Sequence, residues 1–262
     1  MTTTIALAGK GGVGKTTIAA LVIKYLMESQ PGAILAIDAD PSSNLNIVLG
    51  VELEWTVGDI REDLLKQVQE SLTAGGAAMG TLSGGMNKHD YLDYEIRSSV
   101  AESDRFDLVA MGRSEGPGCY CAVNHNLRSV IDAMSKNYRY VVVDNEAGME
   151  HLSRRTTRDV EALLVVTNPS QRGITAAERI GGFRDELDIH IENTYLVLNG
   201  LRGDTIPQPL QERIDGLDFP LLGTIPYDEA LLEYEFSGQS LVGLGDDSAV
   251  YQAAATLFRQ IL

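Results

Sequence analysis

Basic residues are scarce in this chain. Its 262 residues include 21 Lys plus Arg against 37 Asp plus Glu, so the formal net charge at pH 7 is −16. Nonspecific binding to nucleic acid needs a cationic surface, and anionic membranes attract basic segments. Neither partner is therefore expected. Arg154, Arg155 and Arg158 form one local basic cluster, which a solvated helix face explains as well.

Long apolar runs and targeting segments are also missing. No stretch of about 18 apolar residues occurs, so no transmembrane helix is expected. The sequence enters its first predicted strand at once, which leaves no room for a signal peptide. Residues 251–262 can dock on the core but lack the lysine-rich face of a membrane-targeting helix. We expect a cytoplasmic protein.

Only two cysteines are present, Cys119 and Cys121. A disulfide framework is excluded, because the cytoplasm is reducing and this spacing is too tight for an easy bridge. The apolar fraction of 44% is instead ordinary for a core built by hydrophobic burial. The length is within reach of one large α/β domain, and we see no linker or internal repeat.

Apolar runs typical of strands alternate with segments of helical periodicity. The expected strands are residues 3–8, 34–38, 106–111, 140–144, 163–167, 195–199 and 221–225, and the expected helices include 17–24, 127–136, 175–187 and 228–236. This alternation predicts an α/β fold: a single domain over residues 1–262, with a mostly parallel sheet flanked by helices on both faces. Residues 66–100 are the least regular part, and we expect a variable, partly mobile insertion there.

Residues 9–16 read Gly-Lys-Gly-Gly-Val-Gly-Lys-Thr, which fits the phosphate-loop pattern G-x-x-x-x-G-K-[ST]. The loop lies between a predicted strand and a predicted helix, where backbone N–H groups can surround a phosphate. Lys15 would reach the β- and γ-phosphates of ATP or ADP, and Thr16 would hold Mg²⁺. The residues expected to contact nucleotide here are Gly11, Gly12, Val13, Gly14, Lys15, Thr16 and Thr17.

A second lysine, Lys10, lies early in this loop. Lys15 already serves the loop's own nucleotide, so Lys10 can meet the phosphates of another one; a solvated lysine is the alternative. The segment KGGVGKTT, residues 10–17, resembles the signature of the deviant Walker A ATPases, which include MinD, ParA and the nitrogenase iron protein. The resemblance implies that two subunits enclose two ATP molecules and that Lys10 acts catalytically across the interface.

Two predicted strands end in aspartate, at Asp38 and at Asp144, and Asp40 follows the first. Mg²⁺ prefers oxygen ligands, and hydrolysis needs a group that positions the attacking water. The resemblance implies that Asp40 orients this water, whereas Asp38 and Asp144 serve the Mg²⁺ shell. An aspartate that only caps a helix is the alternative.

Three later residues resemble the family's adenine site. Asn199 ends a predicted strand and matches the adenine-binding asparagine, and Pro226 with Tyr227 match the loop that flanks the base. An asparagine at a strand end can also simply shape a turn.

Cys119 and Cys121 follow a predicted strand through a glycine-rich loop, and we expect them on the active-site face. Two thiolates are half of a tetrahedral S₄ site, and a twofold homodimer would supply the other half. Thiolates suit Zn²⁺ in this geometry, whereas Ni²⁺ tends toward square-planar sites, and the spacing does not choose between them. Buried core thiols are the alternative. His125 and His151 could assist a metal or be ordinary polar histidines.

Four segments occur in a characteristic order: KGGVGKTT, DADPSSNL, GPGCYC and DNEAGMEHLSR, at residues 10–17, 38–45, 116–121 and 144–154. Together they resemble the CooC family of ATPases, which mature the nickel centre of carbon monoxide dehydrogenase; a sister group acts on acetyl-CoA synthase. The resemblance implies a Mg²⁺-dependent ATPase that assists nickel insertion as a homodimer. It also implies that Cys119 and Cys121 hold Ni²⁺ or Zn²⁺ between the subunits. Two alternatives stay open: a positioning ATPase, and an iron–sulfur cluster carrier with Cys₄ ligation.

Overall fold

The computed structural model describes residues 2–73, 87–113, 129–146, 159–183 and 189–262. The predictions for the two cysteines, for His125 and His151 and for the arginine cluster concern residues outside these ranges. Within the described ranges, no helix combines the length and the apolar composition needed to cross a membrane.

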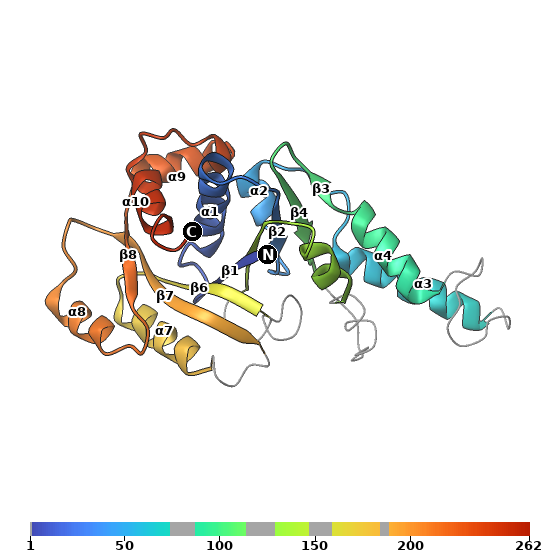
Figure 1. Cartoon of the computed structure of the whole chain (residues 1–262), viewed down its shortest axis with the longest axis horizontal. Coiled ribbons are helices and arrows are strands. Elements are labelled where there is room, and N and C mark those ends of the chain that lie inside the picture. The colour runs from blue at the N-terminus through green and yellow to red at the C-terminus, as the bar shows by residue number, and fades with distance from the viewer. Residues whose placement is uncertain (1, 74–86, 114–128, 147–158, 184–188) are drawn as a thin grey trace.

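Eight strands form one sheet at the centre of the molecule (Figure 1). In chain order they are β1 (Thr3–Ala8), β2 (Ile34–Asp38), β3 (Ala101–Glu102), β4 (Phe106–Ala110), β5 (Tyr140–Asp144), β6 (Asp159–Thr167), β7 (His190–Leu201) and β8 (Leu221–Pro226). Their order across the sheet is β3-β4-β2-β5-β1-β6-β7-β8. All neighbouring pairs are parallel except β3 and β4. The predicted α/β fold with a mostly parallel sheet is therefore confirmed.

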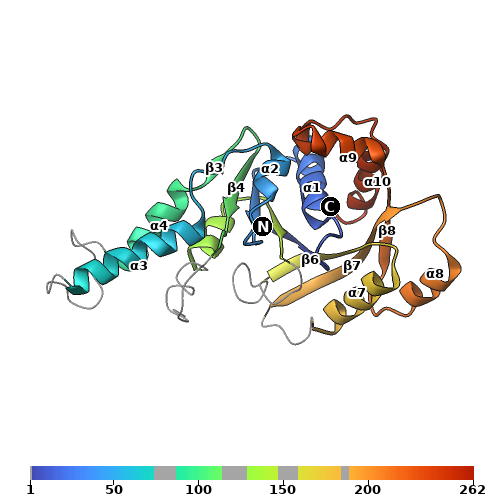
Figure 2. The ribbon, with the colours of Figure 1, turned by 180° about the vertical axis from the view of Figure 1, so that it is seen from behind.

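Helices cover both faces of this sheet, as Figures 1 and 2 show from opposite sides. They are α1 (Lys15–Ser29), α2 (Leu45–Leu49), α3 (Val57–Thr73), α4 (Lys88–Ser98), α7 (Gln171–Phe183), α8 (Gln208–Asp215), α9 (Glu229–Phe236), α10 (Ala249–Phe258) and the 3₁₀ helix η2 (Leu241–Gly243). Residues 129–135 are also helical. The helices α1, α2 and α10 pack on one face, whereas α3, α4, α7 and α8 pack on the other.

The central strands are apolar because both of their faces are covered. All five residues of β2 and all five of β5 are buried, as expected for parallel strands between two helical layers. Side chains alternate between the two cores: Ile5 and Leu7 of β1 face the α1 side, and Ala6 and Ala8 face the α7 side. This packing fixes the end of β1, from which the phosphate loop starts.

The described parts of residues 66–100 are mostly helical, and the variable insertion expected there stays a prediction. Residues 57–73 and 88–98 form α3 and α4, which pack against each other and project from the β3–β4 end of the sheet (Figures 1 and 2). Only a narrow apolar stripe is buried, including Leu64, Leu92 and Ile96. The polar remainder of both helices hid the helical periodicity, and the glycine pairs lie between the helices, outside the described residues.

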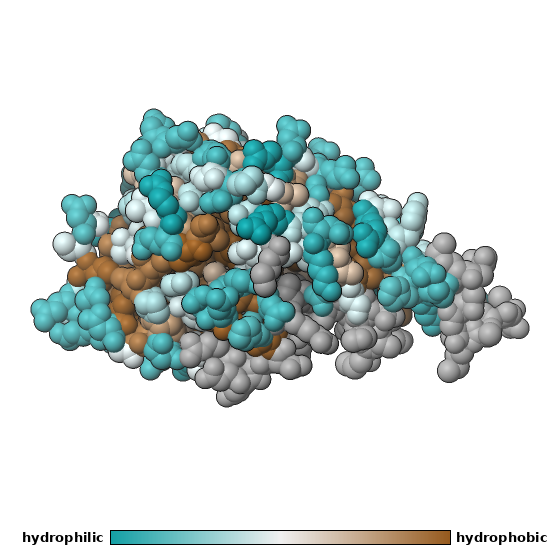
Figure 3. All heavy atoms as spheres, viewed as in Figure 1, coloured by the Kyte–Doolittle hydropathy of each residue, from teal (hydrophilic) through white to brown (hydrophobic). Residues whose placement is uncertain are grey.

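Element boundaries differ from the predicted ones mainly at strand starts. β6 begins at Asp159 rather than at residue 163, and β7 begins at His190 rather than at 195. The predicted docking of residues 251–262 on the core is confirmed, since Tyr251, Ala254 and Phe258 are buried. At the opposite end from α3 and α4, the edge strand β8 is only half-buried, and Figure 3 shows apolar side chains exposed over the β7–β8 end beside α8.

Candidate functional site

The glycine-rich loop joins β1, in the middle of the sheet, to α1. A Cβ atom on Gly9 would lie 2.3 Å from the carbonyl oxygen of Val166 on β6, and one on Gly14 would lie 2.4 Å from the amide nitrogen of Asn199. Both glycines also have positive φ angles, 154° and 90°, which other residues rarely adopt. The motif's glycines are thus required by close backbone packing as well as by loop shape.

Asn199 near the end of β7 supports this loop directly. Its side-chain amide donates a hydrogen bond of 2.9 Å to the carbonyl oxygen of Val13. The contact connects positions 186 residues apart and fixes the loop just before α1 begins. The contact between Asn199 and adenine stays a prediction.

Lys15 is 7% exposed at the start of α1. Its ammonium donates a long hydrogen bond of 3.4 Å to the carbonyl oxygen of Lys10. Burial lowers the pKa of Lys15, while the carboxylates of Asp144, Asp40 and Glu146 oppose this shift. A buried cation near carboxylates, with no ion pair to any residue that the structure describes, is suited to receive phosphate oxygens.

Thr16 and Asp144, which the sequence assigned to Mg²⁺, are brought together. The Thr16 hydroxyl donates a hydrogen bond of 2.6 Å to Oδ2 of Asp144, whereas Oδ1 is buried and has no hydrogen-bond partner among the described residues. Burial raises the pKa of Asp144 to about 7. A hydroxyl beside an unpartnered buried carboxylate oxygen matches the oxygen ligands that Mg²⁺ prefers, so these residues fit the ion.

Asp38 lies beside Asp144 in the register of β2 and β5, but its oxygens already have partners. Oδ1 accepts a hydrogen bond of 3.0 Å from the backbone N–H of Asp40, and Oδ2 accepts one of 2.9 Å from Leu45. Burial raises the pKa of Asp38 to about 6. In this structure Asp38 therefore organises the loop after β2, and its role in the Mg²⁺ shell stays a prediction.

Asp40 lies within this loop and is half-buried. Its Oδ1 accepts a hydrogen bond of 2.8 Å from the backbone N–H of Ser42. This is a turn contact; the residue that precedes α2 is Asn44. The negative charge of Asp40 raises the pKa of Lys15 and so opposes the effect of burial. The assignment of Asp40 to the attacking water stays a prediction.

Several contacts around the loop carried no recognisable sequence signal. The Thr17 hydroxyl donates a hydrogen bond of 2.9 Å to Glu235, which ties α9 to the start of α1. The guanidinium of Arg202 lies 4.0 Å from the ring centroid of Tyr227, a cation–π pair at the predicted base-flanking loop. The preceding residue, Pro226, ends β8. Both contacts join separate segments of the chain, which explains why spacing alone did not reveal them.

The predicted thiolate site lies outside the described residues, as do His125 and His151. Among the residues described, no group of three or more His, Cys, Asp or Glu side chains is arranged to hold a metal ion. The structure describes the segment that leads toward the cysteines as far as Arg113. In this segment the backbone N–H of Met111, directly after β4, donates a hydrogen bond of 2.8 Å to the carbonyl oxygen of Asp38. The chain thus leaves β4 at the edge of the sheet that carries the phosphate loop.

We expect the stability of the nucleotide-free protein to fall as pH rises from about 4 to about 7. An unfolded aspartate ionises near pH 3.9, whereas Asp144 in the folded protein ionises at about 7. Between these values the folded chain binds a proton that the unfolded chain has lost, so the free energy of unfolding decreases with pH. Asparagine does not ionise, so Asp144→Asn should remove this decrease in the free energy of unfolding. The variant should be more stable than wild type at pH 8 by up to about 4 kcal/mol.

Urea unfolding in EDTA at pH 4.5 and pH 8 measures this effect. The stabilisation should be present at pH 8 and small at pH 4.5. Asp204→Asn, at an exposed aspartate after β7, is the matched control and should change neither value. Equal stability of wild type and Asp144→Asn at pH 8 would contradict the interpretation.

Comparison with known proteins also indicates a nucleotide-binding protein. Residues 4–242 match the family described as CobQ/CobB/MinD/ParA nucleotide binding domain. The chain is 42% identical to an uncharacterized ATP-binding protein of Methanocaldococcus jannaschii, with 98% of each chain covered. It is 29% identical to the carbon monoxide dehydrogenase accessory protein CooC of Rhodospirillum rubrum, over 92% of this chain and 89% of that one.

Among solved structures, the septum site-determining protein MinD of Pyrococcus horikoshii, complexed with Mg-ADP, superposes with a TM-score of 0.67. The match covers 100% of this chain and 96% of that one, at 23% sequence identity. At this identity, the likeness establishes the fold alone.

Proposed function

Because this chain belongs to the CobQ/CobB/MinD/ParA nucleotide-binding domain family of P-loop ATP-binding proteins, we propose that it is a Mg²⁺-dependent ATPase that acts as a nickel metallochaperone. Its client would be carbon monoxide dehydrogenase or acetyl-CoA synthase. The observation that carries the proposal is a convergence at one sheet edge: the phosphate loop, the Thr16–Asp144 pair and the exit of the chain from β4 toward Cys119 all lie there.

Hydrolysis at this edge needs little covalent chemistry from the protein. Lys15 and the loop N–H groups hold the β- and γ-phosphates, and Asp40 orients a water molecule in line with the γ-phosphorus. The water oxygen forms a bond to phosphorus as the bond to the β,γ-bridging oxygen breaks, which releases ADP and phosphate. Thr16 and Asp144 would hold Mg²⁺, which neutralises phosphate charge when bound.

Lys10 supports a dimeric arrangement. Its side chain is exposed on the loop and makes no hydrogen bond or ion pair with the described residues. It is therefore available to the nucleotide of a second copy, as the family resemblance implies. Closure of two copies around ATP would also bring their Cys119 and Cys121 pairs together, and hydrolysis would relax the interface and change the affinity for the metal.

The nickel role rests on the cysteine pair and on the relatedness to CooC. Cys119 follows Arg113 by six residues, so covalent geometry keeps it within about 20 Å of the described edge. The 29% identity to the carbon monoxide dehydrogenase accessory protein extends over nearly the whole chain. Soft thiolates at the interface would carry Ni²⁺ as cargo, and Zn²⁺ is the metal ion that competes for the same thiolates.

Anaerobic size-exclusion chromatography with metal analysis, with and without Ni²⁺ and nucleotide, tests the proposal. We expect a dimer that holds about one Ni²⁺ or Zn²⁺ per two chains, because each chain supplies half of an S₄ site. Dimerisation by ATP alone, without metal, would instead favour a positioning ATPase. A brown chromophore in anaerobically purified protein would favour an iron–sulfur cluster carrier.

A further inference from the structure

The carboxylate of Glu235 lies beside the phosphate loop. Glu235 belongs to the last turn of α9, and its Oε1 accepts the hydrogen bond of 2.9 Å from the Thr17 hydroxyl. The side chain is half-buried, and no residue that the structure describes donates a hydrogen bond to Oε2. A carboxylate only accepts hydrogen bonds, so this second oxygen is suited to a ligand that carries a hydrogen-bond donor.

The helix α9 has anchors other than Glu235. Leu231 and Tyr234 pack against the core on the α1 face of the sheet. The Tyr234 hydroxyl donates a hydrogen bond of 3.0 Å to the carbonyl oxygen of Ser240, and the side chain of Asp228 caps the first turn of the helix. A buried apolar pair and a cap of this kind hold a short helix in place. The position of Glu235 is therefore fixed independently of its bond to Thr17.

Glu235 lies between the two ends of the proposed nucleotide site. Thr17 marks the phosphate end, at the start of α1. Tyr227 marks the predicted base end: it directly precedes Asp228 and α9, and its backbone N–H donates a hydrogen bond of 2.9 Å to Leu201 at the end of β7. Seven helical steps separate Asp228 from Glu235, about 10 Å along the axis. In a nucleotide, the ribose is the group that joins the α-phosphate to the base.

The chemistry of a carboxylate also favours the ribose over the other parts of a nucleotide. Phosphate oxygens are negatively charged, so Glu235 repels them. The amino group of adenine is a donor, but the predicted base loop lies at the opposite end of α9 from Glu235. The 2′- and 3′-hydroxyls of the ribose are donors that carry no charge, and they lie on the part of the nucleotide nearest Glu235.

We propose that Glu235 binds the ribose of the nucleotide, with its carboxylate accepting a hydrogen bond from the 2′- or the 3′-hydroxyl. The site would then select nucleotides that keep this hydroxyl. The inference rests on the proposed function, because it assumes that the phosphate loop binds ATP or ADP. It adds a preference that the loop itself does not supply, since the loop contacts phosphates.

Isothermal titration calorimetry with Mg-ADP, Mg-2′-deoxy-ADP and Mg-3′-deoxy-ADP tests the assignment. Wild type should bind ADP at least about tenfold more tightly than one of the two deoxynucleotides, as expected for a hydrogen bond to a charged group. In Glu235→Ala this preference should fall below about twofold. The ratio of the affinities is the decisive quantity, because a merely structural role of Glu235 would change the binding of all three ligands equally.

Two further variants make the test specific. Glu233→Ala removes an exposed carboxylate of the same helix and should keep the wild-type preference. Glu235→Gln retains an oxygen that accepts hydrogen bonds but loses the charge, so a preference of about threefold should remain. The glutamine variant also decides the question if Glu235→Ala does not fold, since a full wild-type preference in Glu235→Gln would contradict the assignment.

Three results would overturn the inference. One is equal affinity of wild type for ADP and both deoxynucleotides, and another is an undiminished preference in Glu235→Ala. The third concerns Mg-IDP, whose base lacks the amino group: a Glu235-dependent preference for ADP over IDP, without discrimination at the ribose, would assign the carboxylate to the base. A chain that binds none of these nucleotides would overturn the proposed function as well, whereas binding without a ribose preference overturns this inference alone.

Discussion

Replacing Cys119 and Cys121 together with serine is expected to remove stoichiometric binding of Ni²⁺ or Zn²⁺. The proposed site needs four thiolates, two from each chain, and the serine hydroxyl is neither soft nor ionised at neutral pH. We expect the metal content to fall from about 0.5 to below about 0.1 per chain, since the double substitution removes every ligand of an S₄ site. Anaerobic equilibrium dialysis followed by elemental analysis measures this ratio.

Two controls make the cysteine experiment specific. Nucleotide affinity, measured with a fluorescent ATP analogue, should be unchanged, because the described phosphate loop is built by contacts from β6, β7 and α9. The His125→Ala/His151→Ala variant should keep its metal, because the proposal assigns no ligand to either histidine. Full metal binding by the cysteine variant, or its loss from the histidine variant, would show that the ligands are misassigned.

The parts of the site that could be predicted from sequence are those set by local geometry. The phosphate loop is recognisable because glycines at fixed positions permit its turns, and the structure adds that Gly9 and Gly14 are also closely packed. The pairing of Thr16 with Asp144 follows from fold class. Parallel strands end at one edge of the sheet, so an aspartate that ends β5 comes to lie beside the loop that follows β1.

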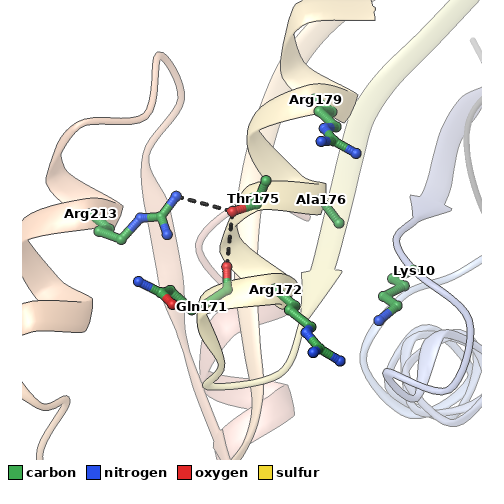
Figure 4. A pocket seen from close by; sticks show the side chains of 7 residues that line it. All are labelled: Lys10, Gln171, Arg172, Thr175, Ala176, Arg179 and Arg213. Atoms are coloured by element: carbon green, nitrogen blue, oxygen red, sulfur yellow. Dashed lines mark hydrogen bonds between the residues drawn. The ribbon is translucent and has the colours of Figure 1, made fainter.

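The parts that escaped prediction depend on contacts between distant segments. Asn199 and Val13 are 186 residues apart, and Thr17 and Glu235 are 218 apart. In each pair, the sequence around one residue gives no indication of the residue that it contacts. The pocket that Lys10 and Arg172 both line is of the same kind (Figure 4), since it forms where β6 pairs with β1 and places α7 beside the loop.

The helices α3 and α4 escaped prediction for a different reason. Helical periodicity is read from apolar residues, and this pair buries only a narrow stripe that includes Leu64 and Leu92. Polar contacts fill the remainder, such as the hydrogen bond of 2.6 Å from the Tyr91 hydroxyl to Asp63. A sparse apolar pattern beside glycine pairs therefore gave no prediction of these two helices.

Lys15→Ala is expected to reduce ATP hydrolysis at least about a hundredfold, in line with the loss of one preorganised group that stabilises transition-state charge. Lys15 is buried at the start of α1 and faces the carboxylates of Asp144 and Asp40. Its removal therefore takes away the phosphate's counter-charge and leaves those carboxylates unopposed, so ATP should also bind more weakly. Phosphate release at saturating Mg-ATP, together with titration of a fluorescent ATP analogue, measures the two effects separately.

The controls for Lys15→Ala separate a failure of chemistry from a failure of folding. Lys66→Ala, at an exposed lysine on α3, should hydrolyse ATP like wild type. Thermal unfolding without nucleotide should show that Lys15→Ala is folded, because deleting a desolvated cation removes a burial penalty while it removes an attraction. Lys10→Ala should retain ATP binding but lose the hydrolysis that depends on protein concentration, since its proposed action is on the nucleotide of a second copy. A folded Lys15→Ala protein with wild-type turnover would mean that the γ-phosphate lies elsewhere, and the assignment of every residue around the loop would then have to be revised.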